Sequence, residues 1–215
     1  PVPTDSPMLI SIHAARQSTP DTELRRLNLP LWSAIPIRIY LGVLKPTRIT
    51  ILGGEFAGEV VQTGKDVTRY QPGDAVYGYT GLRMGTHAEY ICLPEKSSGL
   101  GGVLGPKPAN LTYEEAAAVP FGALEALHTL RQAAIRPGQQ VLIVGAGGSI
   151  GTYAVQLALQ AGAEVTGVDS ASKLEMLRSL GAAHVIDYAQ EDFTQNGQTY
   201  DVILDTINKS PFFGS

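Results

Sequence analysis

The stretch QVLIVGAGGSIGTYAVQLALQAGAEVTGVD, residues 140–169, decides the fold. Its first five residues, 140–144, form a short apolar run rich in β-branched side chains, which predicts a buried parallel strand. A glycine-rich turn follows, and an amphipathic segment over 152–160 predicts a helix. A second strand is expected over 164–168, ending on Asp169. Strand, glycine turn, helix and strand form a βαβ unit, so the sequence predicts an α/β fold.

The glycine turn has the composition of a phosphate-binding loop. Glycines let the chain turn with φ values that a Cβ forbids, and they let backbone N–H groups approach an anion. The N-terminus of the following helix adds unpaired N–H groups and positive charge. Asp169 follows Gly151 at roughly the 20-residue spacing of a dinucleotide fingerprint. A tight turn without a ligand is the alternative. The predicted cofactor-binding residues of the turn are Gly145, Gly147, Gly148, Ser149, Ile150 and Gly151.

The composition is that of a globular protein. The chain has 215 residues, of which 44% are apolar and 17% charged, and a net charge of −4, which suits one large or two ordinary domains. No Lys/Arg run stands out, so nucleic acid is not an expected partner. No apolar run approaches the roughly 20 residues that span a bilayer, so no membrane partner is expected. The N-terminus lacks a signal-peptide layout, and the single Cys92 excludes an internal disulfide, so we expect a cytoplasmic protein.

Two kinds of periodicity divide the chain. Over residues 8–14 and 51–93, apolar and polar residues alternate in short stretches separated by Gly/Pro turns. This pattern predicts a compact β-barrel-like domain. The period shifts from strand-like to helical near residue 114, where Thr112 and Glu115 match a capping box. We therefore expect domains at 1–114 and 115–215. The Gly/Ser-rich segment 95–108 is expected to be a surface connection.

Five further segments complete the secondary-structure prediction. A helix is expected within 16–28, and the apolar segment 29–44 is interpreted as core packing or as the wall or lid of a substrate pocket. In the second domain we expect a helix over 172–180, followed by strands over 183–188 and 202–205.

Four segments in order resemble the medium-chain dehydrogenase/reductase superfamily: LGGEFAGEVVQTGKDVTRYQPGDAVYG, LTYEEAAAVP, GAGGSIG and LGAAHVIDY. The branch that looks most similar is the zinc-free quinone-oxidoreductase-like group, which includes zeta-crystallin. The resemblance implies a GroES-like β-barrel domain followed by a Rossmann-type doubly wound parallel sheet. It also implies an NADPH-dependent reductase that transfers hydride from the nicotinamide to a quinone or an α,β-unsaturated carbonyl.

Several properties stay open within that resemblance. The residues identify no catalytic side chain. The alternatives are an enoyl-thioester reductase of the same superfamily, a non-catalytic, crystallin-like NADPH-binding protein, and an inactive fragment. Relatives continue beyond both ends of this sequence, so the chain is expected to be truncated at both ends, with an incomplete cofactor sheet. The full-length form is expected to be a homodimer acting on a small molecule.

The resemblance also bears on zinc. Zinc-dependent relatives carry His where this chain has Gly54, and four structural cysteines in the loop that corresponds to 95–108, which has none. An open zinc site needs three N, S or O ligands. One cysteine and four scattered histidines offer no such set at ligand spacing. We therefore expect no zinc.

The choice of cofactor depends on residues after the second strand. Asp169 should accept hydrogen bonds from a ribose 2′-OH and repel a 2′-phosphate, which favours NADH. Lys173 and Tyr188 match residues that contact the 2′-phosphate in similar quinone reductases, and Ser170 adds a hydroxyl donor. We expect NADPH, with NADH as the alternative. A solvated helix residue is the alternative role for Lys173.

Overall fold

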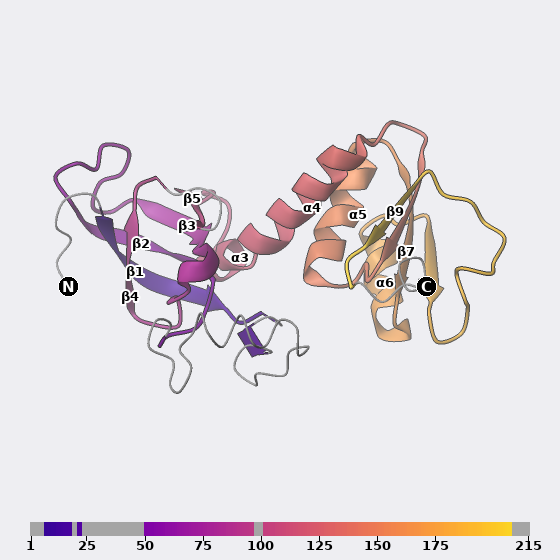
Figure 1. Cartoon of the computed structure of the whole chain (residues 1–215), viewed down its shortest axis with the longest axis horizontal. Helices are drawn as coiled ribbons and strands as arrows, with labels where there is room; N and C mark the ends of the chain where they lie inside the picture. Colours follow the sequence, from indigo (N-terminus) through magenta and orange to yellow (C-terminus); the bar gives the residue numbers. More distant parts are fainter. Residues whose placement is uncertain (1–6, 19–20, 23–49, 97–100, 208–215) are drawn as a thin grey trace. The chain divides into compact units, whose positions relative to one another are not determined.

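The computed structural model describes residues 7–18, 21–22, 50–96 and 101–207 (Figure 1). Contacts divide the chain into two compact units, Pro1–Pro120 and Phe121–Ser215. The domain boundary at 114/115 stays a prediction. The helix expected within 16–28 lies mostly, and the apolar segment 29–44 wholly, outside the described residues. Among the helices that are described, none is both long enough and apolar enough to cross a membrane.

The first unit contains a five-stranded antiparallel sheet with the order β4-β1-β2-β3-β5 (Figure 1). Its elements are β1 (Pro7–Arg16), β2 (Glu55–Thr63), β3 (Ala75–Tyr79), the 3-10 helix η1 (Gly81–Arg83), β4 (Tyr90–Pro94) and β5 (Val103–Pro106). The core contains Met8, Ile10, Phe56, Val60 and Val76, all without exposed surface. The alternation of buried and less buried residues along β1 and β3 follows from one sheet face packing on this core. The predicted β-rich domain is confirmed.

The prediction of a surface connection over 95–108 is wrong for its second half. β5 (Val103–Pro106) lies in that segment and pairs with β3, from Tyr79↔Val103 to Val76↔Pro106. The two backbones approach so closely that a Cβ on Gly78 would collide with the Val103 carbonyl. Gly102 enters the strand with a φ of +90°. The glycines that suggested a loop are therefore what permits this strand pairing.

The first unit ends in a short capped helix, α3 (Tyr113–Ala117). The Glu115 N–H donates to Thr112 Oγ1 at 3.2 Å, and the Thr112 N–H donates to Glu115 Oε2 at 2.8 Å. This reciprocal pair is the predicted capping box, which is confirmed. Ala116 and Ala117 pack against Ala57 of β2.

The second unit is a four-stranded parallel sheet with helices on one face (Figure 1). Its elements are α4 (Pro120–Ala133), β6 (Gln140–Val144), α5 (Ser149–Gln160), β7 (Glu164–Asp169), α6 (Ala171–Ser179), β8 (His184–Asp187) and β9 (Val202–Asp205). The strand order β8-β7-β6-β9 is 3-2-1-4 in order of appearance, as in a Rossmann sheet. Both the strand-turn-helix-strand prediction and the Rossmann-type fold class are confirmed.

Both faces of the sheet are buried at its central strands, β6 and β7. One face, including Val141 and Ile143, packs on side chains of α4, α5 and α6. Leu142 and Val144 on the other face pack with Phe193 and Tyr200 of the 188–201 connection. This two-sided burial explains the continuous apolar run that predicted β6.

Helix α5 begins three residues earlier than predicted, at Ser149 instead of Thr152. Gly151 therefore lies in the first turn of the helix and not in the loop. A Cβ there would collide with the Gly145 carbonyl and the Ala146 backbone, so the helix start rests directly on the loop. The glycine signals this close approach, which sequence reasoning had assigned to the turn itself.

Candidate nucleotide-binding site

Three strand ends bring the predicted residues to one edge of the parallel sheet. β6 leads into the glycine loop, β7 ends on Asp169, and β8 is followed by Tyr188. The strands are parallel and in register, with Val144 beside Val168 and Asp169 beside Asp187. Ligands of open α/β sheets bind beyond the carboxyl ends of the strands. This edge is therefore the candidate site.

The loop after β6 is a tight backbone turn. The N–H groups of Gly145 and Ala146 donate to the Val168 carbonyl at 2.9 and 3.1 Å, and the Gly148 N–H donates to the Gly145 carbonyl at 3.0 Å. Gly145 has a φ of +77°, a region that favours glycine. A Cβ on Gly145 would lie 2.5 Å from Thr206 Oγ1 and 2.7 Å from Ile207 Cγ2. The segment after β9 thus closes over this glycine, a contact that sequence reasoning missed.

The N-terminus of α5 is open. The first intrahelical bond runs from the Thr152 N–H to the Gly148 carbonyl at 3.0 Å, so the N–H groups of Ser149, Ile150 and Gly151 precede the helical ladder. The N-cap residue Gly148 supplies no side-chain cap, and the first turn contains no acidic residue. Backbone donors and the positive helix end therefore meet at one point, which suits the diphosphate of a dinucleotide.

The side chains of the helix start point elsewhere. Ser149 Oγ is buried without a hydrogen-bond partner among the described residues, and a Cβ on Gly122 of α4 would lie 2.5 Å from it. The Ile150 side chain packs against the hydrophobic core between the sheet and the helices. Both residues therefore contribute their backbone N–H groups to the edge, and not their side chains.

Asp169 lies at the centre of this edge, 7% exposed. Its Oδ2 accepts from the Gly147 N–H at 2.8 Å, and its Oδ1 accepts from the Ser170 N–H at 2.8 Å and from Ser170 Oγ at 3.3 Å. Lys173 Nζ lies 3.2 Å from the same Oδ1. Burial raises the pKa of Asp169, but the N–H groups of Ser170 and Gly147 and the Lys173 ammonium together lower that pKa below its ordinary value. The carboxylate is therefore charged at neutral pH.

Lys173 lies beside this carboxylate, and Tyr188 follows the neighbouring strand β8. A Cβ on Gly147 would collide with Lys173 Cδ, so the lysine stem crosses directly over the glycine loop. The Lys173 side chain is 43% exposed. Tyr188 is 59% exposed, and its N–H donates to the Asp169 carbonyl at 3.3 Å. Both side chains are thus accessible to solvent, Lys173 beside the Asp169 carboxylate and Tyr188 directly after the end of β8.

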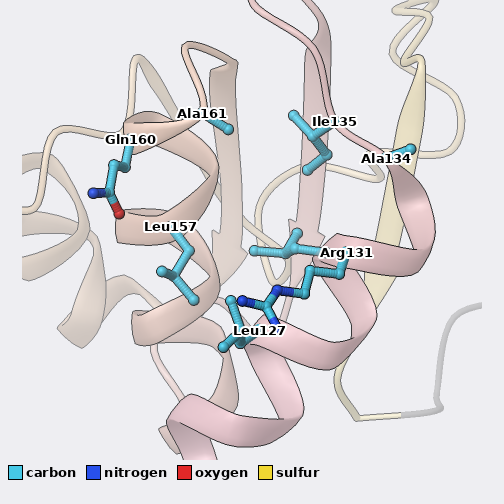
Figure 2. A pocket seen from close by; sticks show the side chains of 8 residues that line it. Leu127, Arg131, Ala134, Ile135, Leu157, Gln160 and Ala161 are labelled. Atoms are coloured by element: carbon cyan, nitrogen blue, oxygen red, sulfur yellow. The ribbon is translucent and has the colours of Figure 1, made fainter.

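Two hollows among the described residues of the second unit lie away from the glycine loop. A groove of about 330 Å³ runs between α4 and α5, lined mainly by apolar side chains such as Leu127, Ile135 and Leu157, and also by Arg131 (Figure 2). A second, polar hollow lies at the opposite, amino end of the strands, beside Gln140, Glu164 and His184. Neither shares a residue with the loop or with Asp169.

The described residues also bear on a metal. Among them, no three His, Cys, Asp or Glu side chains lie close enough to hold an ion. Gly54, where the zinc-dependent pattern has His, faces the Tyr79 ring, and a Cβ there would lie 2.9 Å from Tyr79 Cε2. Gly54 itself therefore supplies no side-chain ligand, and a larger residue there would meet the Tyr79 ring.

Two family models match the chain in order. The alcohol dehydrogenase GroES-like domain matches residues 4–109, and the zinc-binding dehydrogenase family matches residues 149–214. Among curated proteins, 2-methylene-furan-3-one reductase of Solanum lycopersicum is 34% identical over 169 residues. That match covers 74% of this chain and 42% of the relative, so the chain spans about two fifths of that protein's length.

Solved structures agree with these matches. The quinone oxidoreductase of Coxiella burnetii superposes with a TM-score of 0.82 at 32% identity, covering 96% of this chain and 62% of that one. The Escherichia coli quinone oxidoreductase complexed with NADPH superposes with a TM-score of 0.71 at 26% identity, covering 89% of this chain and 53% of that one. With a GroES-like domain, a Rossmann sheet and these relatives, the chain belongs to the medium-chain dehydrogenase/reductase superfamily, in its quinone-oxidoreductase-like branch.

Proposed function

We propose that this chain is part of a zinc-independent, NADPH-dependent oxidoreductase that transfers hydride to a quinone or an α,β-unsaturated carbonyl. The observation that carries the proposal is the open N-terminus of α5, which faces the same sheet edge as Asp169, Lys173 and Tyr188. The reductase and quinone oxidoreductase names of the relatives supply the reaction class. The bound nicotinamide would supply the hydride.

The chain's own residues would bind and orient the cofactor. The N–H groups of Ser149, Ile150 and Gly151 would donate to the diphosphate, since they lack acceptors within the helix. Lys173 and the Ser170 hydroxyl, which both approach Asp169 Oδ1, would contact the 2′-phosphate, and Tyr188 at the end of β8 would lie near the adenosine ribose. A cation here favours NADPH over NADH, and Asp169 opposes that preference.

The remaining parts of the proposal rest on chemistry and on the relatives. The reaction needs an oriented nicotinamide and donors toward the developing enolate or phenolate oxygen, so it requires no metal. Gly54 supports zinc independence, since glycine has no ligand atom and a histidine there would have to displace the Tyr79 ring. The proposal also includes that the full-length protein is a cytoplasmic homodimer and that its substrate is a small molecule.

Two substitutions at one position test the phosphate contact. Ser149→Pro removes one N–H at the first helical position, where proline is tolerated and where the preceding Gly148 is already extended, with φ −84° and ψ 178°. Ser149→Ala is the matched control, because it removes the unpartnered hydroxyl but keeps the N–H. Loss of one hydrogen bond to a charged phosphate should weaken NADPH binding by about tenfold or more. The readout is the NADPH titration of intrinsic fluorescence. Equal affinity of the two variants would contradict the proposed site.

Turnover separates the proposed reaction from the alternatives. NADPH consumption is followed by its absorbance with quinones, enones and enoyl thioesters as acceptors. Consumption with quinones or enones supports the proposal, and consumption with enoyl thioesters alone would assign the chain to enoyl-thioester reduction. Stabilisation by NADPH without consumption would indicate a non-catalytic binding protein.

A further inference from the structure

Neighbouring groups of the chain already donate to both carboxylate oxygens of Asp169. Oδ1 faces three donors, namely the Ser170 N–H, Ser170 Oγ and Lys173 Nζ, and Oδ2 accepts from the Gly147 N–H. The side chain is only 8% exposed. A ribose diol needs two accessible lone pairs on the carboxylate. Oδ1 has no lone pair left, and the one that remains on Oδ2 is largely shielded from solvent, so the carboxylate cannot make the bidentate contact that the sequence pattern suggests.

Lys173 is held by the same arrangement. Its ammonium lies 3.2 Å from Asp169 Oδ1, one helical turn along the chain, and its stem crosses Gly147. Among the described residues, Lys173 forms an ion pair with no acid other than Asp169. Because Gly147 has no Cβ, the lysine can lie flat against the loop. The lysine that would meet a 2′-phosphate is thus already paired with a carboxylate.

We infer that Asp169 is a positioning residue that holds Lys173, and not a ribose ligand, and that this pairing limits the preference for 2′-phosphorylated dinucleotides. The inference rests on the proposed nucleotide site. A 2′-phosphate must share the ammonium with Asp169, whereas an unphosphorylated ribose makes no demand on it. Removal of the carboxylate charge therefore strengthens the binding of NADPH and leaves the binding of NADH almost unchanged.

The test is a double-mutant cycle on this chain, with NADPH and NADH as probes that differ only in the 2′-phosphate. Asp169→Asn, Lys173→Met and the double variant are titrated by calorimetry. Glu175→Gln is the matched control, because it removes a carboxylate from α6, the helix that carries Lys173, at a position 89% exposed and paired with Arg178 in the structure described. Thermal unfolding of each variant checks that the fold is kept.

Three variants and one control have distinct expected results. Asp169→Asn tightens NADPH about tenfold and changes NADH less than about twofold. Lys173→Met weakens NADPH and leaves NADH unchanged. In the Lys173→Met background, Asp169→Asn no longer tightens NADPH, because the gain depends on the freed ammonium. Glu175→Gln binds both nucleotides as the unchanged chain does.

Two results would overturn the inference while leaving the proposed function intact. A tenfold loss of NADH affinity in Asp169→Asn would make the carboxylate a ribose ligand. An equal NADPH gain with and without Lys173 would mean that Asp169 repels the phosphate directly. If the unchanged chain binds neither nucleotide, the proposed function fails and the inference fails with it.

Discussion

Each unit buries a carboxylate beside a glycine turn, but the two carboxylates are held differently. Glu55, 2% exposed, stands at the start of β2 and pairs with Arg16 of the neighbouring strand, its partner in the sheet register, at 2.9 Å. Asp169, 7% exposed, stands at the end of β7 and is held mainly by backbone N–H groups and by an exposed lysine. The first pair links two strands. The second faces the loop where a ligand is proposed to bind.

The same contrast holds for two helix starts. The N-terminus of α3 is closed by its own capping box, whereas that of α5 has a glycine at the N-cap and no side-chain cap. Helix N–H groups that a side chain caps stabilise the fold, and uncapped N–H groups stay available to donate to a ligand. The first unit therefore uses the N–H groups of its helix start for stability, and the second unit keeps those of α5 uncapped at the proposed nucleotide site.

The largest effect is expected at the ion pair of the first unit. Arg16→Met removes the guanidinium from the buried Glu55 carboxylate and should lower the free energy of unfolding by about 3 kcal/mol. Arg178→Met is the control, because its pair with Glu175 is exposed and is worth only about 0.3 kcal/mol. Urea unfolding measures both. Similar losses in the two variants would remove the distinction between a structural and a surface ion pair.

The second effect concerns Asp169 and pH. Burial raises the pKa of Asp169, but the donors that surround it lower that pKa below the ordinary 3.8. A depressed pKa in the folded state stabilises the fold above the unfolded-state pKa, and this contribution is lost as pH falls through the folded-state pKa. Asp169→Asn should therefore cost about 2 kcal/mol at neutral pH. The difference from the unchanged chain should shrink as the pH falls below 3.8. A difference that is independent of pH would contradict the charged-acceptor role.

A smaller effect is expected at the α3 cap. Thr112→Ala removes the oxygen that accepts the Glu115 N–H, which should cost about 1 kcal/mol. Thr112→Ser keeps an acceptor in place and should cost much less. The two variants are compared by thermal unfolding. If they lose equal stability, the effect comes from packing of the Thr112 methyl group and not from the cap.

These contrasts show what the sequence could and could not predict. Apolar runs and the Thr112–Glu115 spacing are local signals, so β6, β7 and the capping box followed from them directly. β5 was missed because its glycines have a non-local cause, the close approach of β3. Asp169 was placed correctly at the strand end, but its donors come from Gly147 and Lys173, whose arrangement depends on the folded loop. Residue types predict which groups meet, but not which groups are already paired.

The smallest effect on stability is expected where the open helix is closed artificially. Gly148→Asp places an acceptor and a negative charge at the N-cap of α5, where the backbone is extended and the nearest atom to a Cβ is the Gly145 carbonyl at 3.2 Å. The cap should add a few tenths of a kcal/mol, about 0.5 at most, because glycine is already a fair N-cap. The same carboxylate would occupy the N–H groups proposed for the diphosphate, so NADPH affinity should fall although stability rises. Gly148→Ala, which adds the Cβ without the acceptor, separates crowding from capping. If Gly148→Asp binds NADPH as tightly as Gly148→Ala, the open start of α5 is not where the phosphates lie.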